Sequence, residues 1–491
     1  MIRKWGATVL AVGLMASTAA AQDAKAVIAN ASKAMGVDGL NSITYYGSGA
    51  NFNLGQSNNA NGQWPRTNLN DYVRSIDFTQ PVSRATAVTW AAPVTGGPAA
   101  QGAFQQNITK DNAAWAQQLE IWVTPWGFLK GAAANNATAK AQTVSGRRFQ
   151  VVTWNAPVKS PGGQPYKVVG YINPANMVER VETWLENPIF GDMLVESIYT
   201  QYREASGGLK YPAFMVQKRG GSSTFEAQIL GANANPANIQ QLVTMPPPPT
   251  GRGGGAGGPG GPGGAPQGPT SEKLADGVYR INGAYNALAV EFADHIFLYE
   301  PGPQNEARAQ AIIAEAKKLI PNKPIRYGVI SHHHFDHTSG LPAAVAEGIT
   351  IVTHQVNVPF FERALNAPRT LAPDSMSKSG KKLKIEGIAG DKRVFQDATR
   401  TVEVHLVKGL PHADGNLIVY LPKERILAYA DMFNLPTAAA PVPNPPVVGT
   451  MVFLDNIERL KLDPERIMSV HSLNPDRLTS VADIRASLGR K

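Results

Sequence analysis

Histidine is concentrated in the second half of this 491-residue chain, and all nine histidines lie beyond position 294. One segment reads SHHHFDHTSG, in which His332, His334, Asp336 and His337 form the pattern H-x-H-x-D-H. Zinc binds neutral imidazoles and carboxylates in a tetrahedral shell. Along an extended chain the side chains of His332 and His334 point the same way, because side chains repeat every two residues. A turn after His334 would direct Asp336 and His337 to a second position, so one loop would serve two adjacent metals.

The chain contains no cysteine. This excludes disulfides, thiolate metal ligands and cysteine nucleophiles, and any metal must be bound by His, Asp or Glu. A chance match to the pattern in a chain of this composition has a probability of about one in ten thousand. The alternative, a His-rich surface loop with adventitious metal affinity, is therefore disfavoured.

Two downstream segments, LVKGLPHADGNLIVYLPKERILAYADMF and IMSVHS, follow the motif in order. With it they resemble the metallo-β-lactamase superfamily over about residues 271–491. The resemblance implies that His412 is the third ligand of a first metal and that Asp431 bridges both metals. It also implies that His471 completes the second metal site. The seven implied metal ligands are His332, His334, Asp336, His337, His412, Asp431 and His471.

The same resemblance implies an α/β fold, the four-layer αββα sandwich of the superfamily. Two zinc ions would hold a bridging hydroxide that attacks a carbonyl carbon. Asp336 would bind the second zinc and orient this nucleophile, which makes it the expected catalytic residue. Iron or manganese would also suit His and carboxylate ligands.

The substrate class is less constrained than the metal site. Many β-lactamases of the superfamily carry a cationic side chain three residues after a Cys ligand, whereas this chain has Asp431 and then the uncharged Asn434. Ala430 replaces the usual Gly and Glu300 the usual Asp, and neither change should prevent metal binding. We expect hydrolysis of an ester, lactone, thioester or amide, with β-lactam hydrolysis as the alternative. Phosphodiester hydrolysis is less expected, because those members usually carry extra His motifs. Oxidative iron chemistry remains open.

A hypothesis of another class is a catalytically inactive periplasmic protein that binds a lipid or envelope component. The complete ligand set argues against it. The other four histidines are expected to be structural; one of them, His354, is a candidate for an indirect role beside the metal ligands. These four are His295, His333, His354 and His405.

The first 21 residues read as a signal peptide, with Arg3 and Lys4, an apolar stretch and Ala19-Ala20-Ala21 before Gln22. They predict a periplasmic or secreted protein. No later apolar run reaches eighteen residues, so no membrane span is expected. The net charge of +9 is not accompanied by clustered basic and aromatic residues, so the expected partner is a small-molecule substrate and not nucleic acid.

A Pro/Gly-rich segment at 245–270 predicts a linker between a β-rich domain at 22–244 and the metal-binding domain at 271–491. The first domain contains no His and shows no catalytic constellation. Its residues 199–221 resemble the strand-turn-strand pattern of periplasmic LolA-like half-barrels. Expected elements there are a helix near 23–36 and strands at 166–172, 177–185, 194–203, 209–218 and 224–230.

In the metal-binding domain, strands are expected at 278–282, 287–291, 296–299, 326–331, 401–407, 416–421, 425–430 and 467–470, with helices at 305–320 and near 452–462. The Ser-, Lys- and Gly-rich segment 366–395 is either a substrate-contacting loop or a solvent-exposed one. It contains a basic cluster that is either a solvated surface or a rim that attracts anionic substrates. This cluster consists of Lys378, Lys381, Lys382, Lys384, Lys392 and Arg393.

Overall fold

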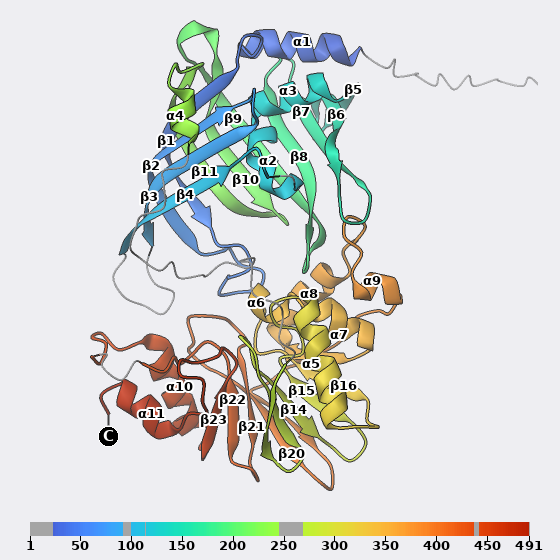
Figure 1. The fold of residues 1–491 in the computed structure, drawn as a ribbon, viewed down its shortest axis with the longest axis vertical. Coiled ribbons are helices and arrows are strands. Elements are labelled where there is room, and N and C mark those ends of the chain that lie inside the picture. Colours follow the sequence, from blue (N-terminus) through green and yellow to red (C-terminus); the bar gives the residue numbers. More distant parts are fainter. Residues whose placement is uncertain (1–22, 92–99, 113, 245–268, 437–440, 491) are drawn as a thin grey trace, which may run out of the picture.

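The structure is a computed structural model that describes residues 23–91, 100–112, 114–244, 269–436 and 441–490. The predicted signal peptide and nearly all of the predicted linker lie outside these residues. Figure 1 shows a strongly curved sheet at one end of the long axis and a layered α/β part at the other. In the described ranges no helix is long and apolar enough to cross a membrane.

The N-terminal part is an eleven-stranded sheet in the order β4-β3-β2-β1-β11-β10-β9-β8-β7-β6-β5. Neighbours in the chain pair antiparallel within each of two runs, and β1 pairs with β11 to join the runs. The β-rich domain and its meander are therefore confirmed. The strands are β1 Ser42–Phe52, β2 Arg66–Asp77, β3 Val82–Ala91, β4 Ala100–Ile108, β5 Thr138–Val144, β6 Arg147–Lys159, β7 Pro165–Ile172, β8 Val178–Asn187, β9 Gly191–Glu204, β10 Lys210–Arg219 and β11 Ser222–Ala234.

Three helices pack against this sheet: in Figure 1, α2 and α3 lie within its curve and α1 lies across one end. The helix α1 (Ala24–Met35) begins at Asp23, whose side chain accepts from the Lys25 amide, and ends at Gly36 with φ 69°. Glycine adopts this left-handed conformation without steric cost. The buried faces of α1, α2 (Trp115–Trp122) and α3 (Pro125–Ala134) share one apolar core with the sheet.

The C-terminal part contains two sheets. The first is mixed and runs in order through β12 (Ser271–Ala275), β13 (Val278–Ile281), β14 (Ala287–Glu291), β15 (Ile296–Tyr299), β16 (Ile325–Val329), β17 (Thr350–His354) and β18 (Lys384–Ile388). The second runs through β19 (Lys392–Gln396), β20 (Thr401–Leu406), β21 (Leu417–Leu421), β22 (Ile426–Tyr429) and β23 (Arg466–Ser469). The helices are α5 Glu306–Leu319, α6 Phe335–Thr338, α7 Leu341–Glu347, α8 Val358–Leu365, α9 Ser375–Ser379, α10 Val448–Arg459 and α11 Val481–Ser487.

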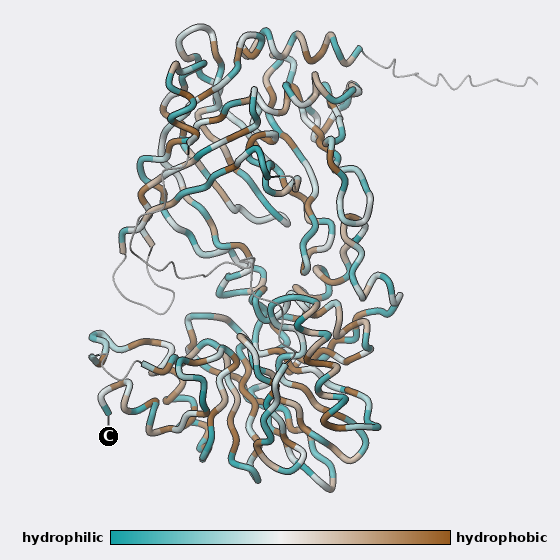
Figure 2. The backbone as a smooth tube through the Cα atoms, viewed as in Figure 1, coloured by the Kyte–Doolittle hydropathy of each residue, from teal (hydrophilic) through white to brown (hydrophobic). Residues whose placement is uncertain are grey.

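The side chains of single strands show how these sheets are layered. On β14, Ala287 and Ala289 pack with α5, α7 and α8, whereas Leu288 packs against the second sheet. On β21, Val419 faces the first sheet and Ile418 packs with α10 and α11. Because successive side chains of a strand point to opposite faces, each sheet separates two apolar cores. The layers are helix, sheet, sheet, helix, which confirms the expected αββα sandwich, and Figure 2 shows the apolar stretches along its strands.

The N- and C-terminal parts meet at the turn between β8 and β9. The ring of Phe190 lies 5.4 Å from that of Phe335 and 5.9 Å from that of Phe360. Beside it, Asp192 accepts hydrogen bonds from the amides of Thr370 at 3.0 Å and Leu371 at 2.9 Å. An apolar contact is thus flanked by directional polar ones.

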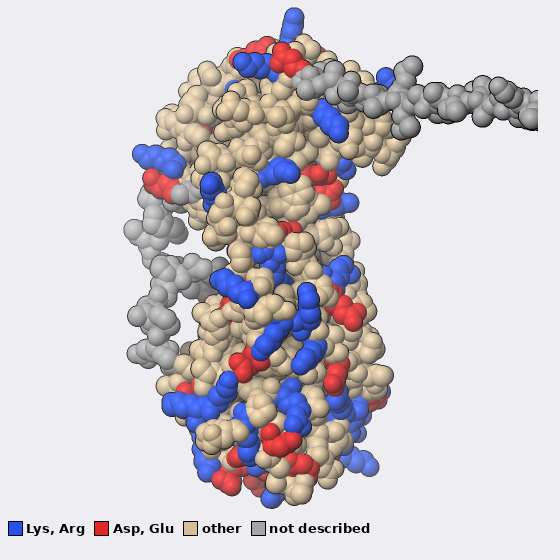
Figure 3. Space-filling model, turned by 90° about the vertical axis from the view of Figure 1, so that its right-hand side faces the viewer, with Lys and Arg blue, Asp and Glu red and all other residues tan. Residues whose placement is uncertain are grey.

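The segment 366–395 is not one continuous loop: it contains short elements as well, and part of it is solvent-exposed, as in one of the two expectations. Its side chain Arg369 is nearly fully buried and donates to the carbonyls of Pro188 at 2.9 Å and Ile189 at 2.7 Å. The remainder contains α9, β18 and most of β19. In its basic cluster Lys392 pairs with Glu403 at 2.6 Å and Arg393 with Glu386 at 2.7 Å. Figure 3 shows basic and acidic side chains interspersed on one face of the molecule.

Candidate metal centre

The H-x-H-x-D-H motif begins three residues after the end of β16, and α6 forms its second half. The other sequence-predicted ligands also follow strands. His412 lies between β20 and β21, Asp431 follows β22, and His471 follows β23. Since β15 and β16 run parallel, as do β22 and β23, these carboxyl ends meet at one edge of the sandwich. Ligands of α/β folds commonly bind outside such strand ends.

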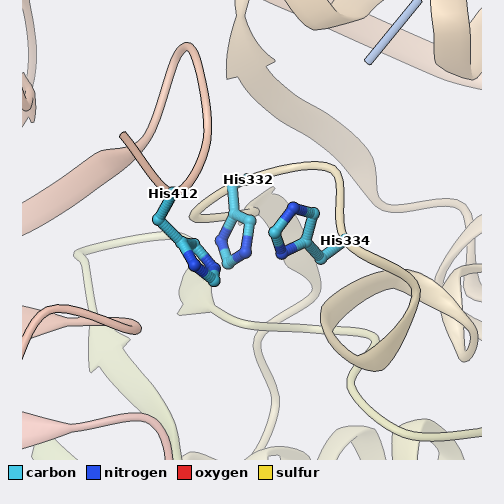
Figure 4. Close-up of side chains that lie close together, drawn as sticks. All are labelled: His332, His334 and His412. Atoms are coloured by element: carbon cyan, nitrogen blue, oxygen red, sulfur yellow. The ribbon is translucent and has the colours of Figure 1, made fainter. Parts of the chain in front are cut away.

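The first donor group consists of His332, His334 and His412, which each offer one ring nitrogen within 4.8 Å of the others. Figure 4 shows the three rings together, with His412 reaching them from a different loop. The ring centroids of His332 and His334 are 4.4 Å apart, and those of His334 and His412 4.5 Å. Three convergent imidazoles are a common zinc ligand set.

The second group consists of Asp336, His337 and His471. The Nε2 atoms of the two histidines are 3.2 Å apart, and Oδ2 of Asp336 lies 3.4 Å from Nε2 of His337. The one-turn helix α6 allows this, because it directs Asp336 and His337 away from the extended segment that carries His332 and His334.

Asp431 lies between the two groups. Its Oδ2 atom is 2.7 Å from Nε2 of His337, 3.4 Å from Nε2 of His332 and 3.7 Å from Nε2 of His412. Its Oδ1 atom is 2.8 Å from Nε2 of His471. The carboxylate therefore faces both groups, the position of a bridging ligand. The structure brings together all seven residues that the sequence singled out.

Unsatisfied polar atoms show that these residues fit a metal. The Nε2 atoms of His332 and His412 are buried and have no hydrogen-bond partner among the described residues. A buried polar atom without a partner costs free energy. Coordination to a cation would satisfy both nitrogens and would neutralise the buried carboxylates beside them.

Hydrogen bonds select which nitrogen of each ring faces the centre. Nδ1 of His332 lies 2.9 Å from Oγ of Ser331, and Nδ1 of His337 donates to Oε2 of Glu300 at 2.7 Å. Both rings therefore present Nε2. Glu300, which replaces the usual Asp, is fully buried and also accepts from the Ser331 amide at 2.6 Å. A carboxylate behind a ligating histidine fixes the ring and raises its basicity.

The N-terminal part reaches the same centre through the connection between β1 and β2. The carbonyl of Ser57 accepts from Nε2 of His334 at 2.9 Å and from Nε2 of His333 at 2.7 Å. His334 is thereby left with Nδ1 for a metal. Gln56 donates from Nε2 to Oδ1 of Asp336 at 2.8 Å. The sequence of this half shows no catalytic constellation, and no local pattern in it predicts these contacts.

A tyrosine near the start of β14 completes the surroundings of Asp336. The hydroxyl of Tyr285 donates to Oδ2 of Asp336 at 3.0 Å, and its ring centroid lies 4.4 Å from that of His471. Desolvation by burial, with the charge of Asp336, raises the pKa of Tyr285. The phenol therefore stays protonated and remains a donor. No local pattern in the sequence marked this residue.

The electrostatics differ between the two groups. Burial lowers the pKa of His334 to about 3, and it lowers the pKa values of His332 and His412 as well. These imidazoles stay neutral, the form that binds metals. Burial alone would lower the pKa of His337, but the charges of Asp431, Glu300 and Asp336 raise it well above its usual value. In the metal-free chain His337 therefore holds a proton.

The remaining four histidines lie outside both donor groups. His333 is buried and holds Ser57, so it anchors the N-terminal connection. His295 packs on the ring of Phe292 with a centroid distance of 4.7 Å. His405 lies on the same strand face as Glu403, whose carboxylate is 2.8 Å from its Nε2 atom, and it is buried. His354 ends β17 and its Nδ1 accepts from the Val356 amide at 3.5 Å, a local contact.

Residues 281–469 match the sequence model of the Metallo-beta-lactamase superfamily. No curated protein matches the chain significantly. Solved structures similar to it include metallo-beta-lactamases from Pontibacter korlensis (16% identity, TM-score 0.32, covering 45% of this chain and 97% of that chain) and Hirschia baltica (18%, 0.34, 45% and 97%). Rubredoxin oxygen:oxidoreductase from Desulfovibrio gigas is also similar (17%, 0.33, 45% and 60%).

The family match does not extend to the N-terminal sheet, so its resemblance to LolA-like half-barrels stays a prediction. In the C-terminal part, the layered fold, the His/Asp clusters and the family match agree. Residues 281–469 are a metallo-beta-lactamase superfamily domain.

Proposed function

We propose that this chain is an exported dinuclear zinc hydrolase that cleaves an ester, lactone, thioester or amide. The observation that carries the proposal is the arrangement of two three-residue donor groups with Asp431 between them. Five imidazoles and two carboxylates without a thiolate suit zinc, and iron or manganese would also accept them. Export is supported by the charged start, apolar stretch and Ala19-Ala20-Ala21 of the first 21 residues.

A zinc pair held by the two donor groups would polarise the carbonyl oxygen of the substrate and would lower the pKa of a bound water toward 7, which gives a nucleophile at neutral pH. The protein must orient that water. Burial raises the pKa of Asp336, but the charge of His337 outweighs it and the net shift is downward, so the carboxylate is ionised. Gln56 and Tyr285 hold its two oxygens from opposite parts of the chain. Asp336 is thus a fixed acceptor for the proton of the attacking water.

Exposure indicates the side from which a substrate arrives. In the first donor group the side chain of His332 is fully buried and that of His412 is 18% exposed, whereas in the second group those of Asp336 and His471 are each 31% exposed. The centre is therefore open toward the second donor group. Tyr285 lies at this opening, where its hydroxyl is a neutral donor that can also contact a substrate oxygen.

The test is metal analysis of the purified mature protein, together with turnover of p-nitrophenyl acetate, dihydrocoumarin and nitrocefin before and after chelation. We expect two zinc ions per chain and ester or lactone turnover that disappears with chelator and returns with zinc. His412→Ala should lose turnover. His354→Ala is the matched control, because it removes a histidine outside both donor groups, and it should retain turnover.

The other outcomes separate the alternatives. Preferred turnover of nitrocefin would assign the centre to β-lactams. Stoichiometric iron with no hydrolysis would favour oxidative chemistry. Little metal and no turnover would contradict the proposal and would favour a binding protein.

A further inference from the structure

The concave side of the N-terminal sheet encloses a cavity of about 460 Å³. This volume lies within the range of small-molecule binding sites, about 300–1,000 Å³. Its walls come from strands of both runs of the sheet and from the end of α2, which lies within the curve of the sheet in Figure 1. None of the seven metal-centre residues lines it, so it is a separate site.

Much of the lining is apolar and aromatic. Such walls bind the body of an apolar molecule by removing its surface from water. Side chains that form this part of the wall are Tyr45, Phe52, Leu54, Phe104, Met215 and Phe225.

Three charged side chains line the same cavity: Arg74, Glu120 and Arg219. Arg219 and Glu120 neutralise each other in an ion pair of 3.0 Å. Arg74 is only 4% exposed, and no carboxylate of the described residues forms an ion pair with it. The cavity therefore carries one uncompensated positive charge, because a guanidinium stays protonated in proteins.

The neighbours of Arg74 are neutral acceptors. Its guanidinium donates to the hydroxyl of Tyr72 at 2.9 Å, to Oγ of Ser83 at 3.2 Å and to the side-chain carbonyl of Gln106. Desolvation by burial raises the pKa of Tyr72, which therefore stays an uncharged phenol. These bonds use three of the five N–H groups that an arginine offers. A buried charge without a counter-charge is unfavourable unless something pairs with it.

We propose that the cavity binds a small monocarboxylate with an apolar or aromatic body, whose carboxylate pairs with Arg74. A carboxylate would neutralise the guanidinium and accept from its remaining N–H groups. The apolar body would lie against the aromatic wall. This binding does not depend on the proposed hydrolysis, because the two sites share no residue.

The test is isothermal titration calorimetry of the full chain with 4-phenylbutyrate and with its uncharged counterpart 4-phenylbutan-1-ol. We expect the acid to bind at least tenfold more tightly than the alcohol. Arg74→Gln should weaken binding of the acid at least tenfold, since a buried charged hydrogen bond is lost. Arg66→Gln, an exposed arginine on the same strand, is the matched control and should leave it unchanged.

Two further variants keep the outcome decisive. Thr89→Trp fills the cavity from β3, where Thr89 lies on the same strand face as the buried Ala85 and Ala87, and it leaves Arg74 in place. It should abolish binding even if Arg74→Gln fails to fold. His412→Ala removes a metal ligand and should leave binding unchanged. Absence of binding at millimolar acid, equal binding of the alcohol, full binding by Thr89→Trp, or loss of binding in His412→Ala would each overturn the proposal.

Discussion

Replacement of Glu300 by Gln tests how the second donor group is held. Both oxygens of Glu300 are used: Oε2 accepts from Nδ1 of His337 and Oε1 from the amide of Ser331. Glutamine has the same shape but a single acceptor oxygen. Its amide group must therefore face one of two buried N–H donors, and either His337 or Ser331 loses its acceptor.

The expected loss follows from this geometry. Removal of the carboxylate behind a ligating histidine costs about 10–100-fold in metal affinity, or about 1.4–2.8 kcal/mol. A second effect opposes it. Glu300 helps to raise the pKa of His337, so the variant lowers that pKa and fewer protons compete with the metal. The deficit should therefore be largest near pH 8, where proton competition is weak, and smaller near pH 6.

Competition with a chromophoric chelator at each pH measures the affinity of both sites. Glu424→Gln is the matched control, because Glu424 is a largely buried acid that pairs with Arg400 away from the centre. It should lower thermal stability without changing zinc affinity. An unchanged second-site affinity in a folded Glu300→Gln variant, or a loss confined to the three-histidine group, would refute the reasoning.

Three further predictions concern the N-terminal connection and pH. Gly55→Ala should lower the melting temperature more than Gly146→Ala. Both glycines have positive φ, 82° and 76°, but a Cβ at Gly55 would lie 2.3 Å from the ring of Phe335, whereas a Cβ at Gly146 meets nothing within 4 Å. Equal losses of melting temperature would contradict the contact between Gly55 and Phe335. Gln56→Ala should lower kcat about tenfold with the fold intact, because Asp336 loses a hydrogen-bond donor. Gln63→Ala, in the same connection, should leave kcat unchanged. Scanning calorimetry checks that both variants are folded. As pH falls from 8 to 5 at fixed free zinc, the ion at Asp336, His337 and His471 should leave first. The raised pKa of His337 lets protons compete with the metal there, whereas the lowered pKa values of His332, His334 and His412 leave little competition at the other group. Elemental analysis should show a plateau at one zinc per chain, and simultaneous loss of both ions would contradict the prediction.

Local patterns account for what could be predicted from the sequence. The helix at 305–320 was predicted because Ala309, Ile312 and Ala316 recur at helical spacing, and all three are buried in α5. The strands β14 and β15 have the predicted bounds because short apolar runs end at clear turns. The ligands were predictable because H-x-H-x-D-H is contiguous and the later segments follow it in family order.

Non-local contacts account for what was missed. The strand β2 reads RTNLNDYVRSID and lacks an alternating apolar pattern, since several of its polar side chains line the cavity or face solvent. Gln56 and Ser57 are ordinary loop residues, and their partners lie 280 and 277 positions away. Tyr285 is likewise unmarked until the fold places it over His471. Such residues acquire a role only through tertiary contacts.

Anomalous-difference density from zinc-loaded crystals tests most directly whether the two donor groups hold two metals. We predict two peaks on either side of Asp431. One should be bound by Nε2 of His332, Nδ1 of His334 and Nε2 of His412. The other should be bound by Asp336 and by Nε2 of His337 and of His471, with zinc–nitrogen distances of about 2.0–2.1 Å. A single peak, a peak outside these groups, or His334 bound through Nε2 and released from Ser57 would contradict it.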